Sequence, residues 1–148
     1  MSLPAPFAEI VEEFAAVTPR QRLELLLDYS TDLPALPQRY VGSRDALEQV
    51  HECQSPLFLA VEVDGDGAAD GCQAVHLFFD APAEAPTTRG FAGILHAGLD
   101  GLAPAEVLAL PDEAPLALGL GEAVSPLRLR GMQAMLARIK RQVRERCG

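Results

Sequence analysis

The chain has 148 residues, the length of one ordinary domain, and 49% are hydrophobic against 22% charged, a balance typical of a globular protein. Its formal net charge of −9 argues against general nucleic-acid binding, because an acidic body repels phosphates. Three cysteines in a chain of this length exclude a disulfide scaffold, and their odd number and long spacings favour reduced thiols.

No segment has the pattern of a secretory signal, and no stretch approaches the ~20 apolar residues of a membrane span. We therefore expect a soluble protein that is located in the cytoplasm and does not contact a membrane. Residues 1–148 are expected to form a single domain.

The first predicted elements are two helices. Apolar residues recur at i, i+3, i+4 and i+7 in the first (Phe7, Ile10, Val11 and Phe14). In the second, Thr18 can cap the helix, Pro19 suits its first position and Gln21 can complete a capping box. This helix should end near residues 29–30, because the following prolines require extended backbone, and its expected core stripe is Leu23, Leu26 and Leu27.

Strands are expected in the middle of the chain. Residues 57–63 and 74–79 are apolar runs separated by a turn signal at 64–67, which predicts an antiparallel hairpin. A short strand at 47–50 can add a third member and make the sheet stable.

Three further helices are predicted after the strands. Residues 88–99 have helical spacing and a small-residue face (Gly90, Gly93 and Ala97), and residues 104–108 form a short helix. Ser125 and Pro126 open a long final helix, whose apolar stripe is Met132, Met135, Leu136, Ile139 and Val143. The order of helices, strands and helices indicates an α+β fold.

Charge is unevenly distributed along the chain. Residues 125–148 carry a net charge of +6, whereas residues 1–124 carry −15. A basic helix can contact an acidic partner, but we favour a solvated helix face with cations near its C-terminus.

Cys53 is the best candidate for chemistry. It lies in a polar stretch with Pro56 just before a predicted strand, and a thiol on such a loop suits nucleophilic or carrier chemistry. His51 is placed to help hold a thiolate, whereas Glu52 would oppose one. Cys72 is expected to be a small residue at a strand edge and Cys147 to be incidental, and no spacing of cysteines and histidines signals a metal site.

Three segments carry a recognisable pattern in this order along the chain. Residues 22–37 form a helix followed by Leu-Pro-Ala-Leu-Pro, residues 50–55 read Val-His-Glu-Cys-Gln-Ser, and residues 125–132 read Ser-Pro-Leu-Arg-Leu-Arg-Gly-Met. They resemble the SufE/CsdE family, with its Leu-Pro-x-Leu segment, its V-x-G-C-Q-S signature and its S-P-x-R-x-x-G-[LM] helix start. Residues 89–91 (Arg-Gly-Phe) stand where the family usually has Lys-Gly-Leu.

The resemblance implies a small three-stranded antiparallel sheet packed against helices, similar to IscU scaffolds. It implies a sulfur acceptor and activator of a cysteine desulfurase of the SufS or CsdA kind, in iron–sulfur cluster assembly. Cys53 would carry the sulfur as a persulfide and pass it to a downstream iron–sulfur scaffold. Arg128 would orient the loop or bind the partner, and the residues expected to shape the loop are His51, Glu52, Gln54 and Ser55.

Pyridoxal phosphate would reside on the partner desulfurase, so the chain itself would need no cofactor and no metal. It would be a sulfur-transfer accessory protein rather than a stand-alone enzyme. Glu52 stands where the family has glycine, which adds a negative charge beside the thiol. We expect the loop to rest against Leu57, Phe58 or neighbouring apolar surface until a partner draws it out.

Two alternatives remain open. An IscU-like metal or iron–sulfur scaffold predicts that Cys53, Cys72 and one further ligand meet in space. A non-catalytic interaction module predicts that Cys53 is incidental. The sequence also leaves open whether the chain forms a homodimer.

Overall fold

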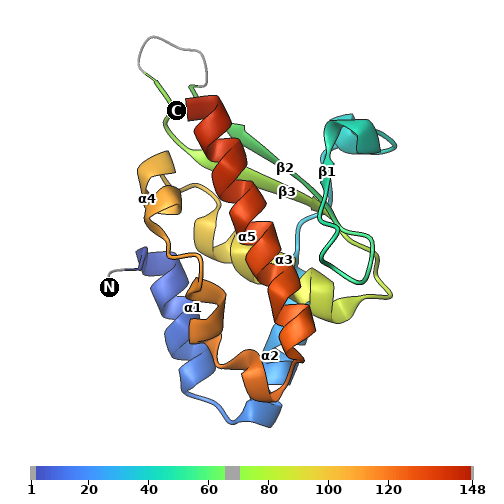
Figure 1. Ribbon diagram of the computed structural model, residues 1–148, viewed down its shortest axis with the longest axis vertical. Helices are drawn as coiled ribbons and strands as arrows, with labels where there is room; N and C mark the ends of the chain where they lie inside the picture. The colour runs from blue at the N-terminus through green and yellow to red at the C-terminus, as the bar shows by residue number, and fades with distance from the viewer. Residues whose placement is uncertain (1–2, 66–70, 148) are drawn as a thin grey trace.

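The computed structural model describes residues 3–65 and 71–147, so residues 66–70, with part of the predicted turn, lie outside the described residues (Figure 1). This part contains five α-helices, four short 3₁₀ helices and a three-stranded antiparallel sheet, which confirms the α+β prediction. In chain order the elements are α1 (Ala5–Ala15), α2 (Pro19–Asp32), η1 (Gln38–Tyr40), η2 (Arg44–Ala46), β1 (Glu48–Gln49), β2 (Phe58–Val63), β3 (Val75–Asp80), α3 (Pro86–Leu99), α4 (Pro104–Ala109), η3 (Ala114–Leu118), η4 (Leu120–Glu122) and α5 (Pro126–Cys147).

Helix α2 begins at the predicted capping box. The Thr18 side chain accepts a hydrogen bond from the Gln21 backbone, and the Gln21 side chain accepts one from the Thr18 backbone. The predicted core stripe is correct only in part, because Leu26 is fully buried while Leu23 and Leu27 are each 39% exposed. Helix α2 buries one narrow face, against α3, and two of the three leucines lie beside that face.

Helix α3 is the central helix, and glycines on its surface let its neighbours approach closely. A Cβ at Gly90 would lie 2.6 Å from the Leu26 carbonyl oxygen, and one at Gly93 would lie 2.2 Å from the Tyr29 carbonyl oxygen. The prediction of Ala97 as the third small contact residue is wrong, because Ala97 is exposed and Gly98 packs against Phe7 instead. The contact position is one residue further along the chain, and each residue turns the helix by about 100°.

The sheet has the order β1-β2-β3, with Leu59 opposite Phe79 and Val61 opposite Leu77. These four side chains lie on one face and are buried in the core. The predicted third strand is confirmed as the two-residue β1, which pairs with the start of β2. Past the start of β1, where β2 has no strand partner on that side among the described residues, the Val61 backbone N–H donates to the side chain of Gln142 on α5 instead, at 3.0 Å.

Helix α5 is the longest element, and the strands lie behind its upper half (Figure 1). It packs against β2, α3, α4, η3 and η4. Its basic residues are not simply a solvated face, which corrects our expectation. Lys140 is buried and donates to the Leu110 carbonyl oxygen and to Asp112. No helix within residues 3–65 and 71–147 is long and apolar enough to cross a membrane.

Candidate functional site

The Cys53 loop, residues 50–57, connects β1 to β2 and is anchored firmly at its base. The Val50 backbone N–H donates to the Leu57 carbonyl oxygen at 2.9 Å, and both side chains are buried. The Cys53 backbone N–H turns back to the Val50 carbonyl oxygen at 3.2 Å. The loop therefore presents Cys53 from a fixed base at the edge of the sheet, and it lies just before β2, where the sequence predicted a loop.

At its tip, the loop rests on α5 at a position that has no side chain. A Cβ at Gly131 would lie 3.1 Å from the Cys53 sulfur, 3.5 Å from its Cα and 3.7 Å from the Glu52 carbonyl oxygen. Cys53 is partly buried there and packs against the hydrophobic core. We expected the loop to rest on Leu57, Phe58 or neighbouring apolar surface. That expectation did not specify the first turns of α5, which form part of the contact surface.

The position of Cys53 against Gly131, which we call the Cys53 seat, keeps the thiol protonated. The pKa of the thiol is raised to about 11 from an ordinary 9.0, mainly by burial and in part by the Glu52 carboxylate, while Arg138 opposes the shift. The direction of this contribution agrees with the expectation that Glu52 opposes a thiolate. At neutral pH the resting group is a thiol, which is a poor nucleophile.

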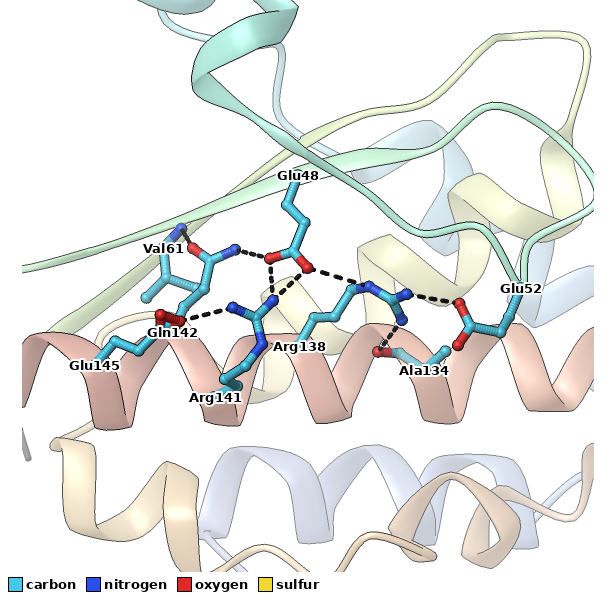
Figure 2. A network of polar contacts seen from close by, with 8 residues as sticks. All are labelled: Glu48, Glu52, Val61, Ala134, Arg138, Arg141, Gln142 and Glu145. Atoms are coloured by element: carbon cyan, nitrogen blue, oxygen red, sulfur yellow. Dashed lines mark hydrogen bonds and ion pairs between the residues drawn. The ribbon is translucent and has the colours of Figure 1, made fainter.

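A polar network ties the loop and β1 to α5 (Figure 2). Arg138 forms ion pairs with Glu52 at 2.9 Å and with Glu48 at 3.3 Å. Glu48 is also bonded by Arg141 and by the amide of Gln142, the latter at 2.8 Å. Arg138 additionally donates to the Ala134 carbonyl oxygen at 3.4 Å, which holds its guanidinium along the helix.

The carboxylates in this network are ionised. The hydrogen bond from Arg138 lowers the pKa of Glu52 below its usual value. Burial opposes ionisation of Glu48, but hydrogen bonds from Gln142 and Arg141 outweigh it and lower the pKa of that carboxyl. Sequence reasoning missed Arg138, although it lies seven residues after Gly131, where the helical period returns to the same face.

The other predicted loop residues lie around Cys53 without fixing it. His51 and Gln54 are exposed and Ser55 is half-buried. Within the described part of the chain, none of these three side chains makes a hydrogen bond or ion pair. Glu52 is thus the member of the predicted set whose side chain forms an ion pair with another element.

Arg128 lies in the first turn of α5, three residues before Gly131 and exposed. Its backbone N–H donates to the Ser125 side chain at 3.3 Å, which confirms Ser125 as the helix cap. Its guanidinium has no hydrogen-bond or ion-pair partner among the residues described. Arg128 is therefore an exposed side chain about one helical turn before Gly131.

The other two cysteines do not join Cys53. Cys72 and Cys147 form a disulfide, so the expectation of reduced thiols is wrong for this pair. Folding brings the region after β2 beside the last turn of α5, with the two Cα atoms 6.0 Å apart. Cys147 lies 16 residues beyond Gly131 on the same helix, a separation of about 24 Å.

Histidines and acids gather at another place, next to β3. His76 and His96 lie 3.5 Å and 3.6 Å from the Asp100 carboxylate, which also accepts a hydrogen bond from the Leu77 backbone N–H. No group of three or more histidine, cysteine or acidic residues within the described ranges is arranged to hold a metal ion.

Comparisons with known proteins extend over nearly the whole chain. The sequence model of a family described as "SufE: Fe-S metabolism associated domain" matches residues 8–143. A protein of Mycobacterium tuberculosis described as an uncharacterized SufE-like protein is 56% identical over 144 residues, 97% of this chain and 95% of that protein. A SufE-like protein of Synechocystis is 28% identical over 131 residues, 88% of this chain and 75% of that protein. The solution structure of a hypothetical protein from Thermus thermophilus is similar with a TM-score of 0.81 and 38% sequence identity, over 97% of both chains.

Proposed function

Because this chain belongs to the SufE family of iron–sulfur metabolism, we propose that it accepts sulfur from a cysteine desulfurase as a persulfide on Cys53. The observation that carries this proposal is the Cys53 thiol, the free cysteine among the described residues, on a loop with a rigid base and a polar tip. Transfer between thiols needs a thiolate and an approach path, and this loop can offer both once its tip leaves α5.

The transfer balances without an external oxidant or reductant. The Cys53 thiolate attacks the outer sulfur of the persulfide on the desulfurase cysteine. A new S–S bond forms at Cys53 while the S–S bond on the desulfurase breaks, and the desulfurase cysteine leaves as a thiolate. The proton lost by Cys53 is matched by the proton that the leaving thiolate takes up.

The resting geometry makes exposure of Cys53 part of the reaction. Since the pKa of the seated thiol is about 11 and that of a free one 9.0, loss of the proton favours the open loop. The closed loop is fully stable below pH 9 and loses stability as the pH rises towards 11. A partner that draws the loop out therefore also makes the thiol easier to ionise.

In this proposal the chain stimulates its partner by removing the sulfur that blocks the desulfurase cysteine, and then delivers it to an iron–sulfur scaffold. Pyridoxal phosphate belongs to the desulfurase, and thiol exchange requires no cofactor or metal on the acceptor. Arg128, exposed about one helical turn before Gly131, is proposed to contact the desulfurase.

The scaffold alternative lacks the geometry that it requires. It needs Cys53 and Cys72 to meet, but Cys72 is bonded to Cys147 at the far end of α5. The interaction-module alternative makes a different prediction, namely that Cys53 can be replaced without loss of partner function.

The test is mass spectrometry without reductant, after incubation with a cysteine desulfurase and L-cysteine. We expect one added sulfur on the Cys53 peptide and none in Cys53→Ser. Desulfurase turnover should rise with the wild-type chain and not with the variant. Equal stimulation by both chains, with no added sulfur on either, would favour the interaction module.

A further inference from the structure

The Cys53 loop is held to the molecule unevenly. Its base is fixed by buried side chains and backbone hydrogen bonds at Val50 and Leu57. At its tip, the ion pair of Glu52 with Arg138 is the one polar side-chain contact to another element among the described residues. This ion pair and the packing of Cys53 on Gly131 together determine whether the tip stays on α5.

Arg138 is fixed before it meets Glu52. Its side chain is 19% exposed and is held by Glu48 and by the Ala134 carbonyl oxygen (Figure 2). Glu48 is in turn held by Arg141 and Gln142. Because the guanidinium is already ordered, pairing with Glu52 costs little further side-chain entropy.

Glu52 is the half of the pair that can leave. Its side chain is 49% exposed and belongs to a loop, whereas Arg138 belongs to a long helix. When the loop opens, Arg138 keeps Glu48 as its partner, so no charge is left buried and unpaired. Besides the packing of Cys53 on Gly131, opening therefore breaks one partly exposed ion pair, which has a small free-energy cost.

We propose that Arg138 is a positioning residue that clasps the Cys53 loop to α5 through Glu52 and so sets how often Cys53 is accessible. This inference rests on the proposed role of Cys53 and adds the residue that regulates access to it. Arg138 itself does not touch the transferred sulfur.

The test is the rate at which iodoacetamide alkylates Cys53 in the full chain at pH 8, measured by peptide mass spectrometry. We expect Glu52→Ala and Arg138→Gln each to raise this rate by about two- to fivefold, the range for a partly exposed ion pair. Since either substitution opens the same clasp, the double variant should react no faster than the singles.

A purely electrostatic role gives a different pattern. Arg138 would then act only by stabilising the thiolate, so Arg138→Gln would slow alkylation, Glu52→Ala would speed it, and the double variant would resemble the wild type. Either that pattern or an unchanged rate in Arg138→Gln would overturn the proposal. The matched control is Arg144→Gln, which removes an exposed cation of the same helix that bonds neither Glu48 nor Glu52 and should leave the rate unchanged.

The double variant also distinguishes opening of the clasp from general destabilisation of the fold. If Arg138→Gln acted by destabilising the whole chain, it would raise the alkylation rate equally in the Glu52→Ala background, which also overturns the proposal. Sulfur loading by a desulfurase is measured in parallel. Loading of the wild type with no change in alkylation among the variants refutes the clasp alone, whereas faster alkylation of the variants without any loading refutes the proposed function alone.

Discussion

Adding one methyl group at Gly131 should displace the Cys53 loop without unfolding the protein. The new Cβ of Gly131→Ala would lie 3.1 Å from the Cys53 sulfur, about half an ångström closer than an ordinary contact. Overpacking of this kind costs about 1–3 kcal/mol if the surroundings cannot move. The loop tip can move, because the Glu52–Arg138 ion pair that holds it is worth only about 1 kcal/mol or less.

The helix itself gains from the substitution. Alanine is favoured over glycine in a helix interior by about 1 kcal/mol, which offsets the remaining strain. We therefore expect the free energy of unfolding in urea to change by less than about 1 kcal/mol. Loosening of the tip by about 1 kcal/mol should raise the alkylation rate of Cys53 roughly fivefold.

The control for this prediction is Gly121→Ala, where a new Cβ would meet no atom within 4 Å. It should leave the alkylation rate unchanged. A Gly131→Ala variant that is more stable, with Cys53 alkylated at the wild-type rate, would refute the reasoning. It would show that the sulfur adjusts within its seat and that the missing side chain does not position the loop.

Three further predictions follow from the same structure. The alkylation rate of wild-type Cys53 should keep rising with pH to about 11 instead of levelling off near 9, and a plateau at 9 would show that the thiol is not buried at rest. Cys147→Ser should lower the free energy of unfolding by about 2–4 kcal/mol in the absence of reductant, because the Cys72–Cys147 disulfide spans 75 residues. With reductant present, the variant and the wild type should be equally stable, which checks that the disulfide is the cause. Gly93→Ala should cost about 2 kcal/mol in urea unfolding, since its Cβ would lie 2.2 Å from a backbone oxygen of Tyr29, and a neutral result would mean that α2 and α3 can separate.

Local signals predicted the fold well where the interaction was itself local. The Thr18–Gln21 capping box spans three residues and was visible as a motif. Burial around α2 was less predictable, because the 3.6-residue period gives a stripe but not its width. Leu26 faces α3, whereas Leu23 and Leu27 flank that contact, and only the packing of the two helices distinguishes them.

Contacts distant in sequence were not predictable from spacing. Cys72 and Cys147 are 75 residues apart, and their pairing depends on where the end of α5 lies relative to the region after β2. The candidate site shows the same division. Cys53 lies in a readable motif, whereas its seat at Gly131 and its link to Arg138 require the loop to be placed against α5.

One face of α5 explains why these distant contacts occur together. Gly131, Arg138 and Gln142 follow one another at intervals of seven and four residues, so they lie along a single stripe of the helix. Gln142 holds the edge of β2, Arg138 holds the loop tip, and Gly131 leaves room for the thiol. In the proposed function, the chain must protect its thiol and yet release it to a partner. Gly131, which has no side chain, and the partly exposed Glu52–Arg138 ion pair meet both needs. The Cys53 loop is closed on α5 at rest, and breaking this ion pair to open it has a small free-energy cost.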